Sequence, residues 1–265
     1  MRIIVPIKQV PETNAVKMDE ETGTMIREGV EAIINPLDLY AIEIAIRLRE
    51  AHGGEVVTVS MGPPKAITAL REAIAMGCDS AVLISGKAFA GSDTWATSYA
   101  LSAAIRTLGE YQLIICGERA TDGDTGQVGP GIASWLDLPV ATYVGKVDEV
   151  NEGSCRVHRL VEDGYEVLQV DLPAVLTVVK EIADPRLPTL RGKQKAKRVE
   201  IPRLGTGDLD VEEASLGLNG SPTRVVRIFR PKVTRRCEKV VAADEQAVHE
   251  AADQLVAFLK QRELI

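Results

Sequence analysis

Short apolar runs alternate with segments of helical periodicity from residue 1 to about residue 145. The apolar runs predict strands at residues 3–7, 55–60, 81–84, 113–116 and 140–144. Between them, apolar residues recur three and four positions apart, which predicts helices at residues 36–52, 63–76, 93–108 and 131–136. Repeated strand–helix units predict an α/β fold in which a doubly wound, mostly parallel sheet has helices on both faces.

A different pattern follows this region. Residues 155–161 and 166–170 alternate apolar and polar positions around Asp163-Gly164, a turn signal that predicts an added β-hairpin. Residues 174–179 form one more apolar strand. We therefore expect residues 1–180 to form one α/β domain with an appended hairpin.

Residues 181–265 are expected to form a separate region. Residues 181–240 lack periodicity and contain several prolines, and only residues 242–260 return to an amphipathic helical pattern. Basic residues gather at Arg191, Lys193, Lys195, Lys197 and Arg198. A segment with so few apolar anchors cannot easily bury itself, so we expect an extended C-terminal arm, ending in a helix, that docks on another subunit. An ordinary solvated loop is the alternative.

Composition and charge exclude several function classes. The 265 residues have a net charge of -7, which argues against a nucleic-acid-binding protein as a whole. No apolar run approaches the roughly 20 residues that cross a bilayer. The N-terminus has no signal-peptide pattern, so we expect a cytoplasmic protein.

Cysteine and histidine positions offer no catalytic or metal-binding pattern. The four cysteines, Cys78, Cys116, Cys155 and Cys237, lie far apart without metal-ligand spacing, and the three histidines match no hydrolase arrangement. We therefore expect no metal site and no catalytic side chain. Any chemistry would be supplied by a bound cofactor.

The most informative segment is the loop at residues 117–130. A strand precedes it, a helix follows it, and it is rich in Gly, Asp and Thr. Unpaired N–H groups at a helix N-terminus bind phosphate, and Gly123, Gly126 and Gly129 would let the backbone approach a ligand closely. The loop matches neither the dinucleotide fingerprint nor the P-loop pattern. A helix capped by Asp124 or Thr125 is the alternative.

The residues that follow the predicted strands indicate that this loop borders a crevice. Ligands of open parallel sheets bind beyond the carboxyl ends of the strands. Lys8 follows the first strand, Met61 the second, and Asn35 begins the next helix after a long connection, in which residues 17–26 predict a small hairpin. The first strand and the loop can face one crevice, which suits an adenine nucleotide and predicts a Rossmann-like sheet.

The chain resembles the beta subunits of electron transfer flavoproteins from end to end. The resemblance rests first on residues 157–177, which fit a specific signature of that family, and then on Ile7-Lys8-Gln9-Val10, Asn35-Pro36 and Ser60-Met61-Gly62-Pro63. Residues 181–190 are similar to the partner-recognition loop of the family.

The resemblance implies a heterodimer whose alpha subunit holds FAD and contacts the C-terminal arm, while the crevice of the beta subunit holds an adenine nucleotide. In many members this nucleotide is a structural AMP, and in the electron-bifurcating branch it is a second FAD. Strand ends and resemblance together give these expected cofactor-binding residues: Pro6, Ile7, Lys8, Asn35, Leu37, Asp38, Met61, Thr94, Thr97, Gly117, Arg119, Ala120, Asp122, Gly123, Asp124, Thr125, Gly126, Gln127 and Val128.

Two glycines favour the bifurcating branch. AMP-binding members usually have an aspartate in place of Gly123 and an asparagine in place of Gly126, so this chain has more room beside the phosphates. Residues 93–98 are also typical of the bifurcating branch, and hydroxyls of Thr94 and Thr97 could reach the flavin, although Asp93 or Thr94 could instead cap a helix.

The resemblance to that branch implies that FAD in the crevice accepts hydride from NADH. The electrons would pass to the alpha-subunit FAD and a dehydrogenase, and to ferredoxin or flavodoxin. Two alternatives remain at this point. One is a simple carrier with structural AMP that shuttles electrons from dehydrogenases to a membrane quinone reductase. The other is an unrelated adenine-nucleotide-binding regulatory module.

The recognition loop is expected to bind a flavin dehydrogenase such as an acyl-CoA dehydrogenase. Leu190 would be an apolar anchor on a proline-stiffened loop, with basic neighbours that speed encounter with an acidic partner. The expected partner-binding residues are Arg186, Leu187, Thr189, Leu190, Arg191 and Lys195.

Overall fold

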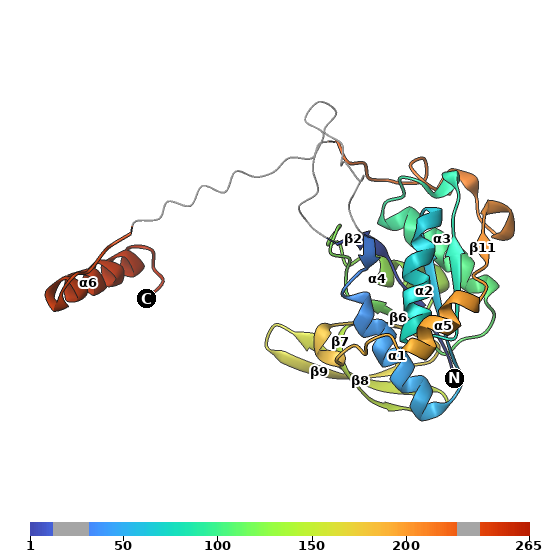
Figure 1. Cartoon of the computed structure of the whole chain (residues 1–265), viewed down its shortest axis with the longest axis horizontal. Helices are drawn as coiled ribbons and strands as arrows, with labels where there is room; N and C mark the ends of the chain where they lie inside the picture. The colour runs from blue at the N-terminus through green and yellow to red at the C-terminus, as the bar shows by residue number, and fades with distance from the viewer. Residues whose placement is uncertain (13–31, 227–238) are drawn as a thin grey trace. The chain divides into compact units, whose positions relative to one another are not determined.

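A twisted sheet forms the centre of the compact unit Met1–Val226 (Figure 1). The computed structural model describes residues 1–12, 32–226 and 239–265. Within them the sheet has nine strands in the order β11-β5-β4-β1-β6-β10-β7-β8-β9. In that order their bounds are Arg203–Leu204, Ser80–Ile84, Glu55–Met61, Arg2–Pro6, Leu113–Gly117, Ala174–Val178, Val140–Val150, Ser154–Val161 and Gly164–Asp171. Pairing is parallel from β11 to β7, and the β7–β8–β9 edge is antiparallel, which confirms the predicted α/β sheet with an added hairpin.

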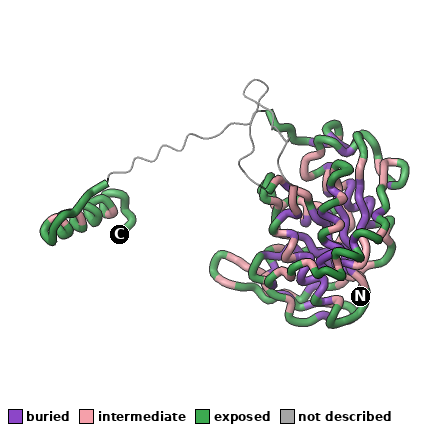
Figure 2. The backbone as a smooth tube through the Cα atoms, in the orientation of Figure 1, coloured by how far each residue is buried: buried purple, intermediate pink, exposed green. Residues whose placement is uncertain are grey.

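Helices cover both faces of the sheet. They are α1 (Asp38–His52), α2 (Ile67–Met76), α3 (Thr94–Thr107), α4 (Val128–Leu136) and α5 (Leu190–Arg198). A further helix, α6 (Glu245–Gln261), belongs to a separate C-terminal unit. Successive side chains of a strand point to opposite faces. Ile3 and Val5 of β1 accordingly pack with α1 and α2, while Ile4 packs with α3 and α4. Because both faces are covered, the central strands are mostly apolar on both sides, and they form the buried interior (Figure 2).

Shorter elements complete the compact part. A small antiparallel pair joins β2 (Gln9–Pro11) to β3 (Ala32–Ile34). Single 3-10 turns lie at Pro64–Ala66, Lys87–Phe89, Lys180–Ile182, Thr206–Asp208 and Glu213–Ser215. The hairpin predicted at residues 17–26 lies outside the described residues.

The region after residue 180 differs from the prediction. Residues 181–226 belong to the compact unit Met1–Val226, so this unit does not end at residue 180. Helix α5 packs on α2, β11 extends the sheet, and Ile201, Leu209 and Leu216 are buried. Three well-spaced apolar residues and one edge strand are enough to fold this segment onto its own sheet, although the sequence shows no periodicity there.

Residues 227–265 form a second unit. Its helix α6 confirms the predicted C-terminal helix, and Asp244 caps it by accepting a hydrogen bond from the N–H of Ala247 at 2.8 Å. No residue of α6 is buried, and Val248, Leu255 and Phe258 expose large apolar side chains. No helix in the described parts of the chain is long and apolar enough to cross a membrane.

Candidate functional site: a nucleotide crevice

A cavity of about 910 Å³ lies at the carboxyl ends of the parallel strands. The ends of β1, β4, β5 and β6 reach it through Pro6, Met61, Ser85 and Gly117. This is the edge at which parallel sheets bind ligands. The volume lies near the upper limit of the range of roughly 300–1,000 Å³ that is typical of small-molecule sites.

Most of the predicted cofactor-binding residues line this cavity. They are Pro6, Ile7, Lys8, Asn35, Asp38, Met61, Thr94, Thr97, Gly117, Arg119, Ala120, Gly123, Thr125, Gly126, Gln127 and Val128. The other three do not line it. Leu37 precedes α1, Asp122 accepts a hydrogen bond from Lys8 Nζ at 2.7 Å, and Asp124 lies 3.2 Å from Arg119 Nε.

Asn35 holds the loop after β6 against the start of α1. Its side-chain amide donates to Asp38 Oδ1 and to the carbonyl of Arg119, both at 2.9 Å, and its Oδ1 accepts from the N–H of Thr121 at 3.1 Å. The side chain is buried, and these three bonds occupy both ends of its amide. The single side chain of Asn35, shortly before α1, therefore fixes the position of the loop that forms the cavity wall.

Asp38 places a titratable group in the same wall. Its carboxylate accepts hydrogen bonds from the N–H of Lys8 at 2.7 Å and from Asn35. Burial raises the pKa of Asp38 to about 7, although both hydrogen bonds act to lower it. A protonation change near neutral pH therefore occurs beside the cavity. Cys116 also lines it, and burial raises the pKa of its thiol, so Cys116 contributes an uncharged surface.

The N-terminus of α4 opens into the cavity without a side-chain cap. Gln127, Val128 and Gly129 line the cavity there, and no side chain of the described residues accepts a hydrogen bond from the first turn. The alternative of a cap by Asp124 or Thr125 is therefore wrong. Gly129 lets this helix approach β10, because a Cβ atom there would lie 2.6 Å from Thr177 Cγ2. Unpaired N–H groups of this kind are suited to bind phosphate.

A second wall was not predicted. Residues 85–87 and 89–93, which connect β5 to α3, and Arg203 of β11 also line the cavity, with Phe89 as an apolar surface. Ser85 and Gly86 directly follow β5, a strand end at which the topology of the sheet places ligand-binding residues. Arg203 could not be predicted, because β11 has only two residues and no pattern.

Asp93 joins this second wall to the end of the compact unit. One oxygen accepts from the N–H of Ala96 at 3.1 Å and caps α3, so the capping alternative is confirmed for Asp93. The other accepts from the N–H of Thr223 at 2.9 Å and from its hydroxyl at 2.7 Å. Thr94 donates to Gln127 Oε1 at 2.8 Å, which connects the N-termini of α3 and α4.

An aromatic cluster lies on α3 and α4 beside this connection. The rings of Trp95 and Trp135 have centroids 4.8 Å apart, and those of Tyr99 and Trp135 are 4.9 Å apart. Trp95 directly follows the cavity-lining Thr94 and is half exposed.

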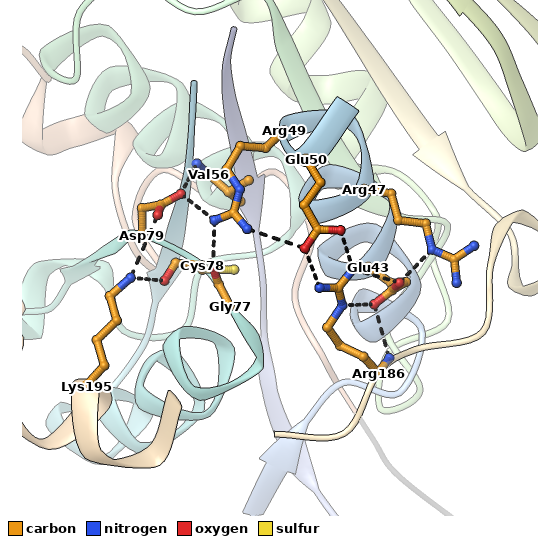
Figure 3. A network of polar contacts seen from close by, with 10 residues as sticks. All are labelled: Glu43, Arg47, Arg49, Glu50, Val56, Gly77, Cys78, Asp79, Arg186 and Lys195. Carbon is orange, nitrogen blue, oxygen red and sulfur yellow. Dashed lines mark hydrogen bonds and ion pairs between the residues drawn. The ribbon is translucent and has the colours of Figure 1, made fainter. Parts of the chain in front are cut away.

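The predicted partner-binding residues lie on one segment but make different contacts. The side chains of Leu187 and Leu190 are 85% and 83% exposed, and Arg191 is also exposed. Thr189 caps α5 by accepting from the N–H of Gly192 at 2.9 Å. Arg186 and Lys195 point back into the protein, toward α1 and toward the end of α2 (Figure 3). No group of three or more His, Cys, Asp or Glu side chains in the described parts of the chain could hold a metal ion.

Comparison with known proteins identifies the family. Residues 22–208 match the electron transfer flavoprotein domain. The chain is 48% identical to the electron transfer flavoprotein subunit beta of Thermoanaerobacterium thermosaccharolyticum and 45% identical to the caffeyl-CoA reductase-Etf complex subunit CarD of Acetobacterium woodii, each over 100% of both chains. It is 42% identical to protein FixA of Azorhizobium caulinodans, over 99% of this chain and 95% of the relative. The chain therefore belongs to the electron transfer flavoprotein family, as a beta subunit.

Proposed function

We propose that this beta subunit binds FAD in the crevice and takes part in electron bifurcation within a heterodimer. The observation that supports FAD is the size of the cavity, about 910 Å³, together with glycine at positions 123 and 126 of its wall. A Cβ atom on Gly123 would meet no heavy atom within 4 Å, so open space lies beside the loop. An adenosine monophosphate would fill much less of this cavity than a flavin dinucleotide.

The residues present suit the parts of FAD. The uncapped N-terminus of α4, with Lys8 and Arg119 nearby, would hold the pyrophosphate. Thr94 and Thr97 offer hydroxyls from the N-terminal end of α3, and Phe89 offers an apolar surface for a ring. When bound, the flavin would supply the redox chemistry, since it takes a hydride from NADH as an electron pair and releases electrons singly.

The proposed electron path leads to three partners. One electron would go to the alpha-subunit FAD and on to a flavin dehydrogenase, and the other to ferredoxin or flavodoxin. Similarity to a subunit named for a caffeyl-CoA reductase complex supports a dehydrogenase partner that acts on CoA thioesters. The exposed apolar residues of α6 support docking of the C-terminal unit on the alpha subunit.

Cofactor stoichiometry tests the proposal. The purified heterodimer is denatured, and released FAD and AMP are separated by chromatography and counted against protein. We expect two FAD and no AMP per heterodimer, and steady-state NADH oxidation that reduces ferredoxin only when the dehydrogenase substrate is present. One FAD and one AMP would contradict the proposal and identify a non-bifurcating carrier.

Cofactor affinity should depend on pH through Asp38. Deprotonation above pH 7 places a negative charge beside a phosphate-bearing ligand, so we expect affinity to fall as the pH rises from 6 to 8. For each unit by which the ligand raises the pKa of Asp38, the affinity should fall about tenfold. Titration of the nucleotide-depleted heterodimer with FAD measures this.

The Asp38→Asn variant should lose this pH dependence. Asp122→Asn is the matched control, because it removes a second carboxylate of the same site and leaves Asp38 intact. The raised pKa of Asp38 should also make the stability of the protein depend on pH. Because the folded state holds the proton more tightly, the free energy of unfolding should fall between about pH 4 and pH 7 and level off above it. An equally steep affinity profile in Asp38→Asn would exclude Asp38 as the cause.

Leu190→Ala is expected to weaken electron transfer to the dehydrogenase without loss of flavin. Leu190 is exposed and touches no part of the cavity, so its loss removes apolar area only from a docking surface. We expect an increase of about tenfold in the KM for an acyl-CoA dehydrogenase that the wild-type heterodimer reduces. Unchanged transfer kinetics would remove Leu190 from the docking surface.

A further inference from the structure

Arg186 connects the recognition loop to helix α1 through five hydrogen bonds (Figure 3). Its backbone N–H and Nε donate to Glu43 Oε2 at 3.1 and 2.8 Å, and Nη2 donates to Glu43 Oε1 at 3.2 Å. Nη1 and Nη2 donate to the two oxygens of Glu50 at 2.7 and 3.0 Å. The guanidinium therefore donates to two carboxylates of α1 that lie about two helical turns apart.

Glu43 is the buried part of this connection. Its side chain is 3% exposed and also accepts from Arg47 Nε at 2.6 Å, while Arg47 Nη2 donates to the carbonyl of Asp184 at 3.2 Å. Burial by itself would raise the pKa of Glu43, but the hydrogen bonds from Arg186 and Arg47 hold it below its usual value. Glu43 is therefore an ionised carboxylate that fixes both Arg186 and the backbone just before it.

A second anchor begins six residues further along the chain, at Gly192. Gly192 of α5 rests against the end of α2, where a Cβ atom would lie 2.0 Å from the carbonyl oxygen of Ala75. Lys195 donates to the carbonyl of Cys78 at 3.0 Å, and Arg71 of α2 donates to the carbonyl of Ala196. These contacts hold α5 against α2 through backbone groups.

Leu187 and Leu190 lie between the two anchors. They are the exposed apolar residues of this segment, and Pro188 between them removes a further backbone freedom. Neither anchor uses their side chains. The pair is therefore presented to solvent by a segment that is fixed at both ends, which lowers the entropy that docking would cost.

We propose that Arg186 is a positioning residue for docking of the flavin dehydrogenase. It holds Leu187 and Leu190 in the arrangement in which they bind this partner. This inference rests on the proposed docking of a dehydrogenase at the loop. It reverses the sequence-based expectation that Arg186 binds the partner directly, because its charge is matched within the chain by Glu43 and Glu50. The charge available to an acidic partner surface is on exposed residues of α5 instead, such as Arg191.

The test is a double-mutant cycle in the intact heterodimer. We call the ion pairs of Arg186 with Glu43 and Glu50 the brace. The brace is removed by Arg186→Gln together with Glu43→Gln, so that no buried carboxylate is left without a counter-charge. The docking residue is removed by Leu190→Ala. The measured quantities are the KM and kcat for an acyl-CoA dehydrogenase that the wild type reduces, with flavin content and NADH-driven dye reduction as measures of an intact fold and crevice.

We expect the brace variant to raise the KM about tenfold and to leave kcat, flavin content and dye reduction unchanged. In the Leu190→Ala background the same variant should add at most about twofold, because Arg186 acts through the loop. A full additional increase would show direct contact of Arg186 with the partner and would overturn the inference. If Leu190→Ala raises the KM and the brace variant does not, the inference is also wrong.

Two further variants keep the test decisive. Glu50→Gln removes the exposed half of the brace, cannot leave a buried charge unpaired, and should raise the KM by about threefold; no change would count against the brace. Arg191→Gln is the control for direct charge contact, and it should weaken the dependence of KM on salt, which the brace variant should not alter. If Leu190→Ala has no effect, the docking part of the proposed function fails together with the inference, whereas the flavin count remains an independent test of the crevice.

Discussion

Replacing Gly123 by Asp and Gly126 by Asn together is expected to leave the heterodimer with one FAD in place of two. Both changes add polar side chains to the wall of the cavity, beside the uncapped N-terminus of α4. The backbone should accept them. Gly123 has open space where its Cβ would lie, and Gly126 has φ +64, a left-handed conformation that Asn tolerates better than most residues. The flavin should be excluded because the added carboxylate repels its pyrophosphate and occupies the space beside it.

The measurement is the count of released FAD and AMP per heterodimer. We expect the crevice FAD to be lost almost completely and AMP to replace it. Gly207→Asp is the matched control, since it adds the same carboxylate at an exposed glycine with free space around its Cβ and away from the cavity. Retention of both flavins in the double variant would show that these two glycines do not select the cofactor.

Asn35→Ala is expected to weaken cofactor binding by about a hundredfold, whichever nucleotide occupies the crevice. The substitution removes the bonds to Asp38, the carbonyl of Arg119 and the N–H of Thr121 at once. Each buried polar group left without a partner costs about 1–3 kcal/mol, so release of the loop is favoured over keeping it in place. A net loss of about 3 kcal/mol in binding corresponds to a factor of about a hundred.

Titration of the nucleotide-depleted heterodimer with FAD and with AMP measures this effect. Gln9→Ala is the matched control, because the amide of Gln9 bonds, among the described residues, to Thr68 and Lys65 on the exposed surface. The loss should be similar for both nucleotides, in contrast to the glycine variants, which should discriminate between them. Binding of normal strength in Asn35→Ala would mean that the loop keeps its position without this side chain.

The central sheet could be predicted from sequence because burial imposes a simple pattern on it. Strands covered on both faces are mostly apolar along their whole length, so the run at residues 113–116 predicted β6 within one residue. The cavity wall after β6 could be predicted for a similar reason. Its glycines and polar residues lie at the end of a buried strand, where the topology of a parallel sheet requires a binding edge.

Other features depend on contacts that leave no local pattern. Helix α5 has charged residues at five of its nine positions, and it forms because Thr189 caps it and because Gly192 and Ala196 let its backbone meet α2. The role of Arg186 depends on Glu43, 143 residues away in the sequence. No spacing rule connects such residues, so the sequence alone could show that Arg186 was charged but not where its charge was used.

The aromatic cluster on α3 and α4 has a practical consequence. The chain has only two tryptophans, and Trp95 and Trp135 lie in contact next to the residues that connect the two walls of the crevice. All indole emission of this subunit therefore originates from one contacting pair, of which Trp95 directly follows the cavity-lining Thr94. An isoalloxazine ring absorbs at these emission wavelengths and adenine does not, so the subunit contains its own optical reporter of which nucleotide it has taken up.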